Sequence, residues 1–175
     1  MTTHELPPFF NFHMLYALRE PRTLPQLGKH LGWHPVQFER TLSDVLDAGL
    51  VHLVDEPAGA LQLDAGAVAS TLAGLDVAGY FAEGTWPDSR DGLFPGEAAQ
   101  LGPVLAAFGA SGGRVEGGLS RADGPALALL ERHQYARRDG DAWVLELNAA
   151  LDMLEQLWPD APKLYEVRWA CEDCK

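Results

Sequence analysis

The segment from Thr23 to Leu63 constrains the fold more than any other part of the chain. Its first half predicts two short helices, because leucines recur there at helical spacing. A glycine follows each predicted helix, Gly32 and then Gly49, and glycine readily adopts the left-handed backbone that ends a helix. Thr23 and Gln26 match the Thr-x-x-Gln capping box at a helix start. We therefore expect a helix, a sharp turn and a second helix.

A β-hairpin is predicted to follow the helix pair. Val51 and Leu53, and later Leu61 and Leu63, alternate with other residues as strand positions do. The residues between them, 55–59, are rich in acidic residues, proline and glycine, as a turn requires.

This order resembles the winged helix-turn-helix superfamily over residues about 10–63. The phrase VLDAGLV is similar to the end of the recognition helix and the first wing strand in many members. Phe12, Leu15 and Leu18 share one face of a preceding helix, which the resemblance places under the helix pair. The resemblance implies a fold and leaves the function open, because one fold hosts many functions.

In such a fold the second helix of the pair would present its outer face to a DNA major groove. That face is predicted to carry Gln37, Arg40, Thr41 and Asp44. Glutamine can read adenine and arginine can read guanine. Leu46 and Leu50 are predicted to be buried against the first helix. An ordinary solvated helix face is the alternative interpretation of the polar residues.

A degenerate second copy of the unit is predicted over residues about 97–147. When the sequence is shifted by 84 positions, the strand segment 61–63 falls on 145–147 without a gap. The segment SGGRVEGGL, where the middle helix of this copy should lie, is a poor helix former. Chance similarity between two helix–hairpin–helix segments is the alternative.

The hairpin of this second copy lies in the one locally basic region of the chain. Asp139-Gly140 is a strong signal for a tight turn, and Arg137 and Arg138 are predicted to lie at its tip. Arginines on a wing can enter a DNA minor groove, whereas a solvated hairpin is the alternative.

These patterns together predict a mainly α fold with small β-hairpins, arranged as tandem winged-helix units. The first unit spans residues 1–82 and includes the helix after the hairpin, whose small residues would allow close helix–helix approach. Residues 83–97 form the linker, and residues 98–175 form the second unit with a C-terminal strand and a CxxC tail.

Neither catalysis nor a bound metal or cofactor is expected. The segment 109–113 matches the Gly-x-Ser-x-Gly nucleophile elbow, but that motif needs a strand before Ser111, where a helical pattern lies. Cys171 and Cys174 form half of a structural zinc site without a second CxxC. We interpret them as a reduced tail, with histidines completing a zinc site as the alternative.

The charge of the chain divides the functional hypotheses. The net charge is −12, from 13 basic and 25 acidic residues. DNA binding draws its non-specific affinity from lysines and arginines that neutralise phosphates, so an acidic chain repels DNA at long range.

No apolar run approaches the roughly 20 residues that span a bilayer. The N-terminus also lacks the basic and apolar regions of a signal peptide, so a cytoplasmic protein with no membrane contact is expected.

Two functions remain open at this point. The first is a DNA-binding transcriptional regulator, a homodimer that uses Gln37, Arg40 and Thr41 in the groove and Arg137 and Arg138 on a wing. The second is an acidic tandem winged-helix protein-interaction module, a scaffold or complex subunit that does not bind DNA directly. It resembles, in architecture alone, the winged-helix subunits that bind kleisins in chromosome-condensation complexes.

Overall fold

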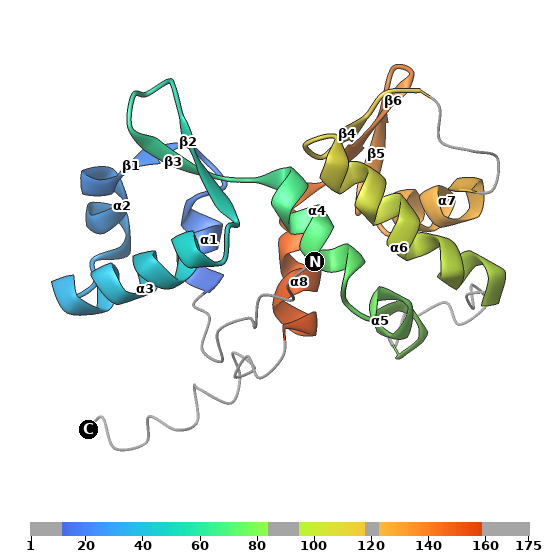
Figure 1. The fold of residues 1–175 in the computed structure, drawn as a ribbon, viewed down its shortest axis with the longest axis horizontal. Helices are drawn as coiled ribbons and strands as arrows, with labels where there is room; N and C mark the ends of the chain where they lie inside the picture. Colours follow the sequence, from blue (N-terminus) through green and yellow to red (C-terminus); the bar gives the residue numbers. More distant parts are fainter. Residues whose placement is uncertain (1–11, 84–94, 118–122, 159–175) are drawn as a thin grey trace.

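A computed structural model describes residues 12–83, 95–117 and 123–158 of the protein. The fold is mainly helical with two small antiparallel three-stranded sheets, which confirms the predicted fold class of two tandem units. Figure 1 shows the two units side by side, each with a hairpin projecting from its helices.

The first unit has the predicted helix–helix–hairpin order, preceded by a helix and a short strand. Its sheet has the strand order β1-β3-β2, so the second strand of the hairpin is central. The elements are α1 (Phe12–Ala17), β1 (Arg22–Thr23), α2 (Leu24–Leu31), α3 (Pro35–Asp47), β2 (Val51–Val54), β3 (Ala60–Leu63), α4 (Ala65–Ala73) and α5 (Val77–Glu83).

The second unit has the equivalent strand order, β4-β6-β5. No helix lies between β4 and α7 in the part that the structure describes, which excludes residues 118–122. The elements are α6 (Pro95–Ala110), β4 (Arg114–Val115), α7 (Gly124–Arg132), β5 (Ala136–Asp139), β6 (Ala142–Leu145) and α8 (Leu147–Leu157).

The offset between the two units differs from the predicted 84 positions. The segments β6 and α8 begin 82 positions after β3 and α4, at residues 142 and 147 against 60 and 65. Before the hairpin loop the offset is 85 positions, since β5 begins at residue 136 and β2 at residue 51, and it falls to 82 because the loop spans residues 55–59 in the first unit and only residues 140–141 in the second. The tight turn after Asp139 was predicted, but its effect on the alignment was not.

Local signals in the sequence set the ends of the first helix pair. The side-chain Oε1 of Gln26 accepts a hydrogen bond from the backbone N–H of Thr23 at 2.9 Å, as in a capping box. Gly32 and Gly49 end α2 and α3 with φ of 62° and 67°, a backbone conformation that side chains other than glycine rarely adopt. These helix ends therefore follow from single residues.

The helix α4 lies against α6, and small residues allow their close approach. A Cβ atom added to Gly66 would lie 2.9 Å from the carbonyl oxygen of Gly109. One added to Gly109 would lie 2.1 Å from Oγ of Ser70. Asp64 caps α4, since its Oδ1 accepts a hydrogen bond from the backbone N–H of Ala67 at 2.9 Å. The predicted close approach of this helix is therefore confirmed.

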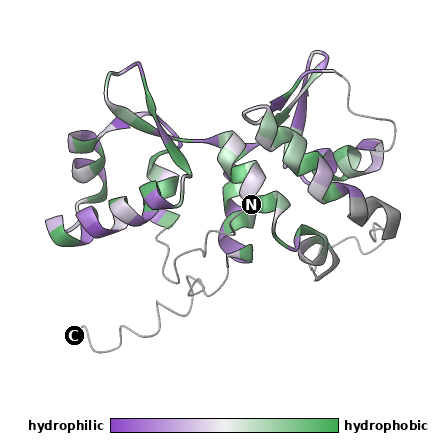
Figure 2. Ribbon diagram, viewed as in Figure 1, coloured by the Kyte–Doolittle hydropathy of each residue, from purple (hydrophilic) through white to green (hydrophobic). Residues whose placement is uncertain are grey.

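One hydrophobic core runs through both units. Buried side chains from α1, α4, α6 and α8 belong to a single cluster, and α4 packs on both α6 and α8. Figure 2 shows hydrophobic segments gathered in these central helices, whereas α3 is mostly hydrophilic. The helix after the first hairpin thus connects the two units through its packing.

The inner face of α3 differs from the prediction at two positions, Thr41 and Leu46. Val45 is fully buried and Thr41 is 8% exposed, whereas Leu46 is 46% exposed. The prediction that Leu46 is buried is therefore wrong, while Leu50 is buried as predicted, at 1% exposure. The buried face is centred on Val45, and Leu46 is turned from it by one residue step of about 100°.

The last helix begins at a different capping residue, and some predicted segments lie outside the described residues. Asn148, an N-cap residue type, lies instead in the first turn of α8, where Glu146 occupies the capping position. The C-terminal strand, Cys171 and Cys174 lie outside the described residues, as does most of the predicted linker.

Candidate interaction surface

The outer face of α3 is exposed, and it is acidic. Arg40 is the one basic residue of α3, and no hydrogen bond or ion pair holds its side chain among the residues described. Three carboxylates share the helix with it, and none of them is buried: Glu39, Asp44 and Asp47.

The first hairpin extends this surface with more negative charge and an exposed apolar side chain. Asp55 and Glu56 are exposed in the loop. Leu53 is 70% exposed, although it lies opposite Leu61, which is 5% exposed. On the central strand β3 the predicted alternation holds, since Leu61 and Leu63 are both buried, whereas Leu53 on the edge strand β2 is an exception to it. Val36, at the start of α3, is also 68% exposed.

Only part of the predicted DNA-reading set lies together. Gln37 and Arg40 are both exposed on the outer side of α3, as predicted. Thr41 is buried on the inner side and has no access to a groove, which corrects its predicted placement. The reason is spacing, since one residue step along a helix turns a side chain by about 100°.

The two arginines of the second hairpin are not at its tip. The tip is formed by Gly140 and Asp141, and Arg137 and Arg138 lie within β5, opposite Val144 and Trp143. Consecutive strand residues point to opposite faces of a sheet. The two guanidinium groups therefore do not form one basic surface.

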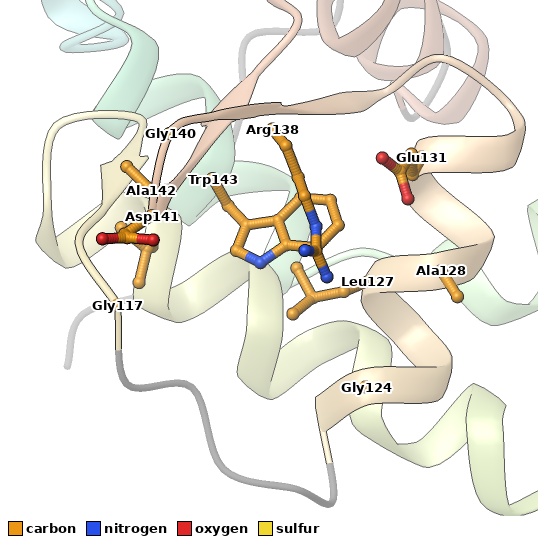
Figure 3. Close-up of a pocket in the computed structure, with 11 residues that line it drawn as sticks. Gly117, Gly124, Leu127, Ala128, Glu131, Arg138, Gly140, Asp141, Ala142 and Trp143 are labelled. Atoms are coloured by element: carbon orange, nitrogen blue, oxygen red, sulfur yellow. The ribbon is translucent and has the colours of Figure 1, made fainter.

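Each of these arginines has a partner within the second unit. Nε of Arg137 lies 2.6 Å from a carboxylate oxygen of Glu146. The guanidinium of Arg138 lies 4.7 Å from the centre of the Trp143 ring, in a cation–π contact. Figure 3 shows this stack beside Leu127 in a cavity of about 370 Å³ between the hairpin and α7.

A third arginine, Arg114, is held on the same sheet. It donates hydrogen bonds to Glu116, at 2.7 Å, and to Asp139. The hydrogen bond from Arg114 lowers the pKa of the Asp139 carboxyl, and the nearby positive charges add to the effect. The same hydrogen bonds raise the pKa of Arg114. The positive charge of the second hairpin is thus largely matched by neighbouring carboxylates.

Besides its apolar side chains, the contact between α1 and α8 has polar partners that the sequence did not indicate. The hydroxyl of Tyr16 donates toward Asp152 and Glu155, the latter at 2.8 Å, and Nη1 of Arg19 donates to Oδ1 of Asn148 at 2.8 Å. Burial and then hydrogen bonding to the two carboxylates raise the pKa of Tyr16. These partners lie about 130 positions apart in sequence, so no local pattern could pair them.

The other chemical candidates show no catalytic arrangement in the described residues. Oγ of Ser111 donates a hydrogen bond to the carbonyl of Ala107 at 2.8 Å, at the end of α6. No group of three or more histidine, cysteine, aspartate or glutamate residues is placed to hold a metal in the segments described. Within the same segments, every helix is too short or too polar to cross a membrane.

Comparisons with known proteins give no relative from which a function of this surface could be inferred. The chain matches no known family, no curated protein and no solved structure. Its function is therefore argued from the residues of the surface.

Proposed function

We propose that the protein is an interaction module of two winged-helix-like units, whose α3 and first hairpin dock another protein. The observation that carries this proposal is the charge of that surface. From Pro35 to Gly59 the chain has one basic residue, Arg40, and five acidic residues, none of which is buried. A helix and wing that bind DNA need positive charge at the phosphates on either side of the groove.

The same surface has features of a protein interface. Val36 and Leu53 are 68% and 70% exposed, on the helix and the hairpin that carry the five acidic residues. Apolar side chains that gain burial and a charged rim that selects the partner are the usual parts of such an interface. The partner proposed is a protein with a basic surface around an apolar centre.

DNA binding is the second candidate, and one observation favours it. Gln37 and Arg40 are exposed on the same side of α3, at the position of a recognition helix, and Arg40 has no competing ion pair among the described residues. The wing arginines do not add to this candidate, because Arg137 and Arg138 point to opposite faces of β5.

Cross-linking in a lysate of the source cells, followed by mass spectrometry, tests the docking surface. The variant Leu53→Glu adds a negative charge at an exposed site on the hairpin. Its matched control, Gln156→Glu, adds the same charge at an exposed site on α8. We expect a partner captured by the parent and by Gln156→Glu to be lost with Leu53→Glu. Capture that is equal in all three proteins contradicts the proposed surface.

Fluorescence polarisation with labelled duplex DNA distinguishes the second candidate. At low salt, where attraction to phosphates is strongest, we expect no saturable binding by the parent. Saturable binding that Arg40→Gln weakens, and that higher salt reduces, would establish DNA binding and overturn the docking proposal.

A further inference from the structure

We propose that the groove between the two units binds a small oxyanion, a phosphate or carboxylate group, through Arg19 and Arg22. The groove has a volume of about 510 Å³, within the range of small-molecule sites. Its walls come from α1, β1 and α2 on one side and from the start of α8 on the other. The site goes beyond the proposed docking function, because a ligand there would contact both units.

The two guanidinium groups are held in place by the end of α1. Nε of Arg19 donates to the carbonyl of Tyr16, and Nε of Arg22 donates to the carbonyl of Ala17, both at 2.8 Å. The last carbonyls of a helix lack helical partners, so arginines that follow the helix bind them well. Two neighbouring carbonyls therefore anchor two cations at the same groove.

Both arginines retain hydrogen-bond donors for a ligand. Nη1 of Arg19 donates to Asn148 at 2.8 Å, and Nη2 of Arg22 donates to Glu20 at 3.1 Å. A guanidinium has five N–H donors, and the hydrogen bonds formed here leave one terminal nitrogen of each arginine without a bond in the described residues. Such paired N–H groups suit the oxygens of a phosphate or carboxylate.

The negative charges at the groove have other partners or are exposed to solvent. Glu146 pairs with Arg137 at 2.6 Å. The side chain of Glu20 is 79% exposed, whereas that of its partner Arg22 is 26% exposed. An exposed ion pair of this kind contributes little stability, so Glu20 can turn to solvent when an anion binds. Arg22 stays, because the carbonyl of Ala17 holds it.

The start of α8 adds a favourable dipole at the same place. Leu147 and Asn148 line the groove and form the first turn of this 11-residue helix. The N–H groups of a first helical turn lack helical acceptors and attract anions. His30, at the end of α2, also lines the groove. The start of α8 and the two arginines therefore favour an anion in the same groove.

Nuclear magnetic resonance on the full-length, ¹⁵N-labelled protein tests the site, with inorganic phosphate as the probe. We expect saturable shifts of the Nε–H signals of Arg19 and Arg22 and of the backbone N–H signals of Leu147 and Asn148. Sodium chloride at equal ionic strength should not reproduce these shifts. An acetate titration distinguishes the ligand class, since a carboxylate site binds acetate as well as phosphate. The absence of saturable shifts with both probes would overturn the proposal.

Variants that each remove one positive charge test which arginines bind the phosphate. Arg22→Gln is expected to weaken phosphate binding roughly tenfold or more, because it removes charge-assisted hydrogen bonds. Arg19→Gln should weaken it as well, which provides a second test if Arg22→Gln folds poorly. The matched control is Arg114→Gln, which removes the same charge from the sheet of the second unit and should bind phosphate like the parent. Equal weakening in all three variants would mean non-specific charge binding and would overturn the site.

Discussion

The packing of α4 on α6 makes the substitution Gly66→Ala a sharp test of the fold. In a helix, alanine is more favourable than glycine by about 1 kcal/mol, so this change stabilises an isolated α4. In the folded protein the new Cβ lies 2.9 Å from the carbonyl oxygen of Gly109 and 3.0 Å from Cα of Gly112. Both contacts are with backbone atoms of the neighbouring helix end, which no side-chain rotation can relieve.

The expected result follows from the balance of these two effects. Overpacking a buried site costs about 1–3 kcal/mol, and backbone neighbours place this site at the upper end. After the gain in helix propensity, we expect Gly66→Ala to lower the free energy of unfolding by about 1–2 kcal/mol. Urea denaturation followed by circular dichroism measures this change.

Gly102 supplies the matched control in the partner helix α6. A Cβ added there has its nearest neighbour at 3.7 Å, the carbonyl oxygen of Ala73, which is ordinary van der Waals contact. Gly102→Ala should therefore raise the free energy of unfolding by about 0.5–1 kcal/mol. If Gly66→Ala is as stable as the parent, or as stable as Gly102→Ala, the close approach of α4 to α6 is refuted.

Two further predictions concern the first unit. Leu50→Ala should lower the free energy of unfolding by about 2–5 kcal/mol, because Leu50 is 1% exposed. Leu46→Ala should lower it distinctly less in the same denaturation assay, because Leu46 is half exposed. Equal losses would contradict the position of α3. The pKa of Tyr16 is raised above its usual value of 10.0, so folding favours the protonated phenol. That contribution is fully present below pH 10 and is lost as the pH rises through the folded pKa. Tyr16→Phe should therefore lose less stability than the parent between pH 9 and 11, and parallel pH profiles in that range would show that Tyr16 does not titrate in this way.

Local signals in the sequence were sufficient for the first helix pair, its hairpin and several helix ends, whereas the short strands β1 and β4 were not predicted. Gly32 and Gly49 end α2 and α3 as predicted, and Asp64, an N-cap residue type, caps α4. These features depend on the backbone conformation or hydrogen bond of a single residue, which neighbours in the chain largely decide. The exposure of Gln37 and Arg40 on one side of α3 likewise follows from helical periodicity alone.

The tertiary structure decided what the helical and strand patterns left open. Helical periodicity predicted Leu46 as buried and Thr41 as exposed, whereas Thr41 is buried and Leu46 is half exposed. Which side of an amphipathic helix is covered depends on the elements packed against it, and single residue types at the edge of that face do not settle it.

The charges of the candidate sites were also decided by tertiary contacts. The sequence placed Arg137 and Arg138 together, but strand pairing directs one to Glu146 and the other to Trp143. The groove with Arg19 and Asn148 forms only because α1 and α8, about 130 positions apart, pack on the same core. Long-range packing sets which charges meet, whereas local sequence sets only which elements carry them.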